Sequence, residues 1–143
     1  MKCIHLETKG ESFTNLPETL DVYNYGCGVI QLQGKLNSQK KSDEHRVNDE
    51  YHNNRDLFLC CDIVEDSYVG NIKVPVLRHF TRNGSGVIDT KIQNVIWLKV
   101  ERTDISRIKL YLTDRKGEIV SFDKGHLTCT LLFIPNKINN EYS

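Results

Sequence analysis

The chain has 143 residues, of which 38% are hydrophobic, and its 19 basic residues are balanced by 19 acidic ones. This length suits one domain, and the hydrophobic share is below the average for globular chains, so part of the chain is not expected to pack. A balanced charge gives no net field that would attract the whole chain to nucleic acid or to an anionic membrane surface. The sequence has no apolar run near the ~20 residues of a membrane span and no signal-peptide core at its N-terminus, so we expect neither membrane insertion nor secretion.

The first third of the chain predicts two short strands, at residues 3–6 and 25–32, with residues 16–18 in the connection between them. Residues 33–55 are different in kind, because five basic and four acidic residues leave too few apolar positions for burial. We interpret this segment as a long exposed loop. The alternative is a helical insert over residues 43–51, whose apolar stripe would have only two members.

The middle of the chain predicts less regular strands. Residues 56–65 form a nearly continuous apolar run, which is typical of a strand covered on both faces. Residues 69–71 have the composition of a turn, and residues 72–80 are predicted to be extended. Pro75 cannot donate a hydrogen bond to a sheet, so it places this stretch at an edge or a kink. Residues 82–86 have the composition of a loop.

The second half of the chain carries the clearest strand pattern, an alternation of apolar and polar residues. Three segments alternate in this way, at residues 94–100, 108–113 and 126–133. Residues 114–117 (DRKG) have the composition of a turn, and residues 118–122 are predicted to return as a short strand. The apolar side chains that share a face are Ile96, Leu98 and Val100, then Ile108, Leu110 and Leu112, then Leu127, Cys129, Leu131 and Phe133.

About eight short strands separated by turns predict an all-β fold, a two-sheet antiparallel sandwich or jelly roll. The chain shows no alternation of strands with helices, which argues against a parallel-sheet enzyme fold. We expect one domain over residues 1–135, with the long polar loop at residues 33–55, and a polar C-terminal tail over residues 136–143.

The five cysteines do not have the pattern of a disulfide framework or a zinc site. Their number is odd, two are adjacent and no C-x-x-C spacing occurs. We expect reduced thiols that mostly act as small buried hydrophobic groups, in a protein made in a reducing compartment. They are Cys3, Cys27, Cys60, Cys61 and Cys129.

The histidines and glycines predict no metal or cofactor site. No two histidines have the spacing of a metal-binding pair, and His45 and His52 in the polar segment are expected to be solvated. His79 and His126 occupy outward positions of predicted strands, toward water or a neighbouring subunit. The run NGSG at residues 83–86 lacks the lysine and the helix of a phosphate-binding loop, so we expect no cofactor.

Asp62, Glu65 and Asp66 follow an apolar strand, and a carboxylate pair could serve glycoside hydrolysis. A hydrolase would need a cavity that gathers Asp62, Glu65 and a histidine. These two carboxylates fall on opposite faces of the predicted strand, however, so we interpret them as strand-end charges. Cys60 or Cys61 could act as a nucleophile only beside a base, and we favour buried, inert thiols. The chain is accordingly not predicted to be an enzyme.

Four basic residues flank two neighbouring strands of the second half, where they could form a basic stripe. Glu101 and Asp104 lie between them and reduce the positive charge. We therefore expect a solvated sheet face, and nucleic acid is not expected as a partner. The four residues are Lys99, Arg102, Arg107 and Lys109.

Several short segments form an ordered set along the chain. The run LCCDIVE at residues 59–65 is followed by VG at 69–70, VPVLR at 74–78, VIWLKV at 95–100, a strand at 105–112, DRKG at 114–117, FDKG at 122–125 and TLLF at 130–133. This order and spacing resembles the capsid proteins that Polinton (Maverick) elements and their viral relatives encode. The resemblance covers residues 56–133 and extends back to a strand at residues 28–32.

The resemblance implies a single jelly-roll domain of the penton (minor capsid) type, and the family has no catalytic residues to carry over. This chain differs at residues 33–55, where relatives usually have an aromatic segment with Tyr-Pro. It is also shorter than many relatives. These differences indicate altered assembly or a copy taken over by a host genome.

The leading hypothesis is a penton-like minor capsid protein, a structural component of the virion. Such a protein would be made in the reducing cytoplasm of the host cell, would self-assemble as a pentamer and would pack against the major capsid protein. The predicted contact residues are the outward-facing Trp97, Tyr111 and His126, together with residues 33–55. The alternative is a monomeric jelly-roll binding module that recognises a protein or a glycan, including a host-domesticated copy.

Overall fold

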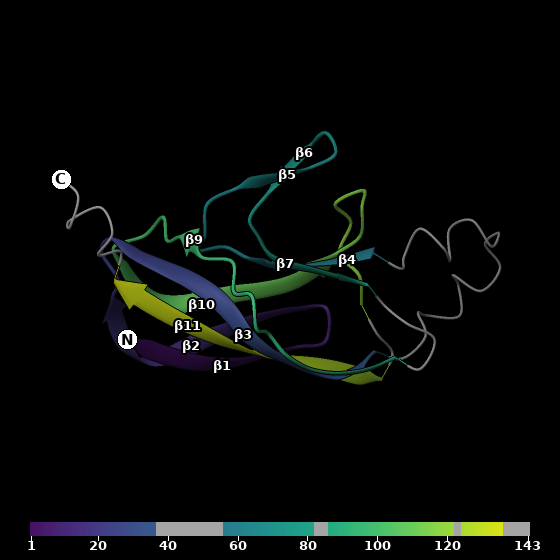
Figure 1. Ribbon diagram of the computed structural model, residues 1–143, viewed down its shortest axis with the longest axis horizontal. Helices are drawn as coiled ribbons and strands as arrows, with labels where there is room; N and C mark the ends of the chain where they lie inside the picture. The colour runs from purple at the N-terminus through teal and green to yellow at the C-terminus, as the bar shows by residue number, and fades with distance from the viewer. Residues whose placement is uncertain (37–55, 82–85, 122–123, 136–143) are drawn as a thin grey trace, which may run out of the picture.

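The computed structural model describes residues 1–36, 56–81, 86–121 and 124–135, and all regular structure within them is β-strand (Figure 1). These ranges contain no helix long and apolar enough to cross a membrane. The strands are β1 (Lys2–Thr8), β2 (Glu11–Asp21), β3 (Tyr25–Leu36), β4 (Asp56–Cys61), β5 (Ser67–Val69), β6 (Ile72–Val74), β7 (Val76–Thr81), β8 (Val87–Lys91), β9 (Leu98–Lys99), β10 (Asp104–Thr113) and β11 (Gly125–Pro135).

Two antiparallel sheets form a sandwich. Sheet A has the order β1-β11-β3-β8, with β9 also paired to β3, and sheet B has the order β2-β10-β4-β7. The β5–β6 hairpin stands apart, and β8 and β9 share one place beside β3. When β5 and β6 are left out and β8 and β9 are counted as one strand, eight strands remain. Numbered along the chain, they follow the order 1-8-3-6 in sheet A and 2-7-4-5 in sheet B. This interleaving of two sheets is the jelly roll, so the predicted all-β fold with about eight principal strands is confirmed.

The core lies between the inner faces of the two sheets, and the alternation predicted for β10 and β11 is confirmed there. Burying one large apolar side chain stabilises a fold by roughly 1.5–3 kcal/mol. A slip of one residue would turn a whole strand's apolar face outward, so the pattern determines the register of both strands. The fully buried residues are Ile108, Leu110 and Leu112 of β10 and Leu127, Cys129, Leu131 and Phe133 of β11.

Residues 94–100 do not form the strand that their alternation predicts. Only Leu98–Lys99 (β9) pairs with β3, because the residues before it pack across the outer side of β3 at Gly28. A Cβ at Gly28 would lie 2.4 Å from Cγ1 of Val95 and 3.1 Å from the backbone oxygen of Ile96. The glycine therefore permits a close approach that any side chain would prevent.

The DRKG turn is present, but the return strand predicted for residues 118–122 is wrong for its described part. Asp114 Oδ1 accepts hydrogen bonds from the backbone nitrogens of Lys116 (2.8 Å) and Glu118 (3.0 Å), which closes the turn. After it, only Ile119 forms a bridge to β10. A longer return strand does not form because both sides of the end of β10 are occupied. One side pairs with β4, and on the other side the N–H of Leu112 donates to the Gly10 oxygen.

β2 is a strand where the sequence predicted a connection. It lies at the edge of sheet B, and its pairing with β10 is interrupted between Asn15 and Leu20. Pro17 falls in this interruption, where the absence of an N–H breaks no ladder hydrogen bond. The proline therefore indicated an irregular edge strand and not the absence of a strand.

Two other predicted segments are shorter or broken. The strand at residues 56–65 ends at Cys61, and Ile63 reaches the core from the turn that follows. The stretch at residues 72–80 divides at Pro75 into β6 and the edge strand β7, so the predicted edge or kink is confirmed.

β3 is longer than predicted, since it continues to Leu36, which is buried. The first four residues of the predicted polar loop at residues 33–55 therefore belong to the strand. The remainder of that loop, the alternative helix at residues 43–51 and the tail at residues 136–143 lie outside the described residues.

Candidate interaction surfaces

The three predicted contact residues lie on opposite sides of the sandwich. His126 alternates with buried Leu127 of β11, so it is on the outer face of sheet A. Trp97 is 42% exposed and covers Gly28 on that same side. Tyr111 belongs to the outer face of sheet B, because it alternates with buried residues of β10. Trp97 and His126 therefore share a face, and Tyr111 cannot join them in one contact patch.

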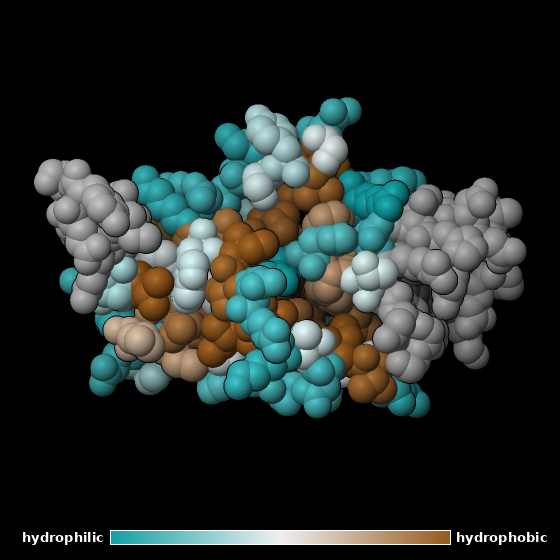
Figure 2. All heavy atoms as spheres, in the orientation of Figure 1, coloured by the Kyte–Doolittle hydropathy of each residue, from teal (hydrophilic) through white to brown (hydrophobic). Residues whose placement is uncertain are grey.

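The outer face of sheet A is apolar near β9. Leu132 and Ile134 of β11 are half-buried and lie opposite two of the three glycines of β3, Gly28 and Gly26. Ile96 beside them is 56% exposed. Figure 2 shows apolar atoms gathered where β3 and β9 are labelled in Figure 1. Contiguous exposed apolar residues are more typical of protein contacts than of a free surface.

The outer face of sheet B is cationic and aromatic near the β2 edge. The guanidinium of Arg107 lies 4.5 Å from the centre of the Phe13 ring, and the ammonium of Lys109 lies 5.3 Å from it. Lys109 also forms an ion pair of 2.6 Å with Glu11 and lies 5.3 Å from the Tyr111 ring. We call these five residues the cation–aromatic face.

Partial burial raises the pKa of Tyr111 to about 12, and the negative charge nearby acts in the same direction. The phenol of Tyr111 therefore stays neutral at physiological pH. Phe13 was missed in the sequence analysis, because its segment was not identified as a strand. Residues 11–15 (ESFTN) contain Phe13 as their one apolar residue, so they show no alternation that could have identified it.

Cysteine chemistry is suppressed throughout the core. Four of the five cysteines are buried, as predicted, and all five are free thiols in this structure. Burial raises the pKa of Cys60 to about 11 and that of Cys27 and Cys129 to about 12, and it raises the pKa of Cys61 well above its usual range. A nucleophilic cysteine needs a lowered pKa, so these thiols lack the activation that catalysis requires.

Asp62 and Glu65 hold loops onto the sandwich. Asp62 accepts hydrogen bonds from the Arg102 side chain (3.0 Å) and from the backbone nitrogen of Lys109 (3.0 Å). Glu65 accepts from the backbone nitrogen of Lys99 (3.3 Å). Among the described residues, no hydrogen bond or ion pair joins a histidine to either carboxylate. The same residues include no group of three or more His, Cys, Asp or Glu side chains that could hold a metal.

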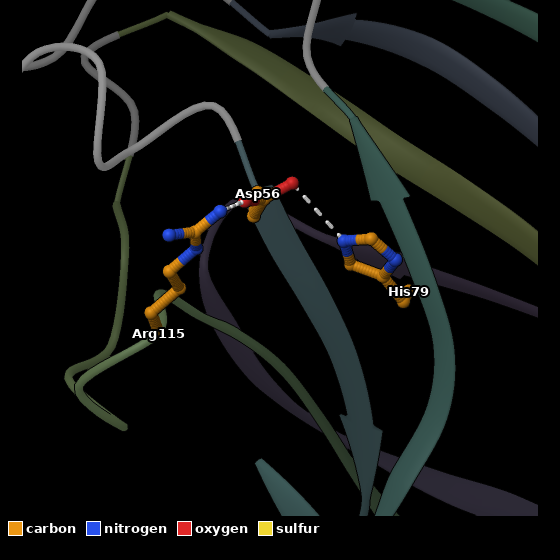
Figure 3. A network of polar contacts seen from close by, with 3 residues as sticks. All are labelled: Asp56, His79 and Arg115. Carbon is orange, nitrogen blue, oxygen red and sulfur yellow. Dashed lines mark hydrogen bonds and ion pairs between the residues drawn. The ribbon is translucent and has the colours of Figure 1, made fainter. Parts of the chain in front are cut away.

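A second polar cluster joins three segments at the start of β4 (Figure 3). Asp56 lies between Arg115, from the DRKG turn, and His79, from β7, and it pairs with both. His79 also stacks on Phe58, with ring centres 4.8 Å apart. The hydrogen bond from Arg115, more than any other contact, lowers the pKa of Asp56. The spacing of these residues along the sequence did not predict the cluster, because only the pairing of distant strands brings its members together.

The β5–β6 hairpin projects beyond the two sheets in Figure 1. Gly70 adopts φ of 61° at the first position of its two-residue turn, a conformation that glycine favours. Ile72 contacts the DRKG turn at Gly117, so one side of the hairpin rests on the body. Tyr68 on the other side is 73% exposed. The turn at residues 69–71 was predicted, but the exposure of Tyr68 was not.

The sequence itself matches no protein-family model, and no curated protein is detectably similar to it. The structure, however, is similar to the crystal structure of the mavirus penton protein, with a TM-score of 0.59 at 7% sequence identity. The alignment covers 92% of this chain and 98% of that chain. The resemblance predicted from short segments is thus confirmed at the level of the fold, and the chain has the single jelly-roll fold of a penton protein.

Proposed function

We propose that this chain is a penton-like minor capsid protein, a structural component of a virion. It assembles into a pentamer and packs against the major capsid protein. The observation that carries this proposal is the match to the mavirus penton protein over nearly the whole length of both chains. The assembling domain is residues 1–135, and residues 136–143 form a tail outside it.

The positions of the outward-facing residues support a ring. In a cyclic assembly each subunit offers one surface to the preceding copy and a different surface to the next. Trp97 and His126 lie on one side of the sandwich and Tyr111 on the other, as two unlike surfaces require. We propose these three residues as contact residues on that basis.

A role without catalysis agrees with the chemistry of the core and loops. The buried thiols have raised pKa values, and Asp62 and Glu65 are engaged by Arg102 and by backbone nitrogens. In this proposal the charged residues position segments of the jelly roll, and the function is geometric.

Light scattering on the eluting full-length protein, over a series of concentrations, tests the proposal. The expected species has five times the 16.5 kDa mass of the chain, and electron microscopy should show five-fold rings. Co-expression with the major capsid protein of the same genome should place the chain in particles. A protein that stays monomeric at every concentration and is absent from particles would contradict the proposal and favour the monomeric binding module.

A further inference from the structure

We propose that the β5–β6 hairpin of one copy docks on the cation–aromatic face of the next copy in the ring. This contact rests on the proposed function, since it needs a self-assembling chain. Its occupant is a second copy, and the docking segment is residues 65–74, which we call the hairpin arm. Three features carry the inference, namely the exposure of the arm, its match in charge and spacing to the receiving face, and its position in the fold.

The hairpin arm is built to present one face outward. Tyr68 lies directly opposite Lys73 in the β5–β6 pair, and both are exposed. Asp66, two residues before Tyr68, is also exposed. On the other face, the half-buried Ile72 rests against Gly117. Tyr68 is thus a projecting aromatic ring with an acid before it along the chain and a base opposite it across the hairpin, and exposed tyrosines are a residue type enriched among interface anchors.

The cation–aromatic face offers the complementary order. Arg107 is exposed and has no carboxylate partner among the described residues, although Lys109 beside it is already paired with Glu11. Phe13 is 54% exposed and lies between Arg107 and Glu11 along the paired strands. The face therefore has an uncompensated cation at one end, an aromatic ring in the middle and a carboxylate at the other end.

Spacing and charge agree between the two surfaces. Residues two apart on a strand are separated by about 7 Å, so Asp66 and Tyr68 have the spacing of two neighbouring positions on the receiving face. With the Tyr68 ring on Phe13, Asp66 reaches Arg107 and Lys73 reaches Glu11. The charges of the arm sum to −1 (Glu65, Asp66 and Lys73) and those of the face to +1 (Glu11, Arg107 and Lys109). Opposite signs favour the correct register and disfavour pairing of two like surfaces.

The placement of the two surfaces suits a head-to-tail contact. In chain order the arm lies between β4 and β7, the edge strand of sheet B, whereas Phe13 belongs to β2 at the opposite edge. Asp66 at the base of the arm lies near enough to Tyr111 of the same copy to help raise the pKa of that phenol. Figure 1 shows the hairpin and β2 on opposite sides of the molecule. A contact between opposite edges uses two different surfaces, so it can repeat from copy to copy and close by rotation.

Substitutions in the full-length chain test the arm. Tyr68→Ala should weaken subunit association about 30-fold, as measured by light scattering or sedimentation over a dilution series. Tyr23→Ala is the matched control, because Tyr23 is a tyrosine with the same 73% exposure outside the arm. Thermal melts of the monomeric fraction should be unchanged in both variants. Equal association of both variants with the parent chain would overturn the contact.

A charge exchange tests the register. Asp66→Arg and Arg107→Asp should each weaken association about tenfold, and the chain that carries both should recover most of it. Lys91→Glu on β8 of sheet A is the control for a change of charge alone. Loss of association in both single variants without recovery in the double variant would overturn the Asp66–Arg107 pairing.

Crosslinking separates this inference from the proposed function. In a Cys3→Ser background that keeps Tyr68 and Phe13, chains with Lys73→Cys and chains with Glu11→Cys should form a disulfide only when mixed. A chain with both changes should form a ladder that ends at five copies. Rings without crosslinks would overturn the arm contact and leave the proposed function standing. A monomeric chain without crosslinks would overturn both.

Discussion

The two outer faces of this jelly roll share one core but differ in chemistry. On sheet A, two glycines of β3 allow residues 95–97 to lie flat, and apolar side chains such as Ile96 collect there. On sheet B, the outward positions of β10 carry two cations beside Phe13 of β2. Identical faces would favour two-fold pairing, whereas unlike faces favour a repeating head-to-tail contact. The comparison shows two chemically unlike outer faces, which is the arrangement that the proposed ring requires.

The largest expected effect comes from removing the core that supports both faces. Leu131→Ala leaves a cavity at a fully buried position and should lower the free energy of unfolding by about 2–5 kcal/mol. Its neighbour Leu132 is half-buried on the outer face of sheet A, so Leu132→Ala should cost less than half as much. Urea denaturation of the two variants makes the measurement, and equal losses would contradict the assigned register of β11.

A smaller effect is expected from separating residues 95–97 from sheet A. Gly28→Ala puts a Cβ 2.4 Å from Val95 and should destabilise the fold by about 1–3 kcal/mol. Gly26→Ala is the matched control, because its Cβ would meet nothing closer than 3.8 Å. Trp97 fluorescence should shift in the first variant and stay unchanged in the second. An unshifted spectrum in Gly28→Ala would show that residues 95–97 do not depend on the glycine.

A still smaller effect concerns the Asp56 cluster beside sheet B. The folded pKa of Asp56 is lowered by Arg115, so its stabilising contribution is present above its usual value of 3.8 and is lost as pH falls through the folded pKa. Asp56→Asn should cost below about 1 kcal/mol at pH 7, because both partners are largely exposed.

That difference between Asp56→Asn and the parent chain should vanish in strong acid. Thermal melts from pH 7 to pH 2 measure it, with Glu18→Gln of β2 as the control for losing an exposed carboxylate. A difference that persisted at the lowest pH would contradict the electrostatic origin of the effect.

The smallest expected effect is a difference in thiol reactivity between two cysteines, one on the outer side of each sheet. Cys3 and Cys60 both occupy outward positions of their strands, yet Cys3 is exposed and Cys60 is buried with a pKa near 11. A thiol reagent at pH 8 should modify Cys3 rapidly and the other four cysteines only on unfolding. Cys3→Ser should abolish the fast phase. A fast phase that remained in Cys3→Ser would contradict the covered position of Cys60.

Regular alternation made some of this architecture predictable. The buried positions of β10 and β11 were correct because a half-buried strand reveals its face by its period of two. Residues 94–100 have the same period and yet form only a two-residue strand. Their apolar side chains pack on the glycines of β3, and a local pattern cannot tell a strand in a sheet from a segment lying over one.

The interaction surfaces were less predictable for the same reason. Trp97, Tyr111 and His126 were all identified as outward-facing, but their division between two opposite faces depends on which sheet receives each strand. Phe13 was missed because Pro17 disguised an edge strand as a connection. Tyr68 was missed because a residue before a turn can lie on either side of a hairpin.

The sequence by itself determined the all-β class, the inner faces of β10 and β11, the DRKG turn and the buried state of most of the cysteines. Each of these follows from local periodicity or residue chemistry. Only the tertiary structure decided the strand order, the assignment of outward residues to sheet A or sheet B, and the Asp56 cluster. These depend on pairing between segments far apart in the chain, and one strand's alternation contains no information about its neighbours.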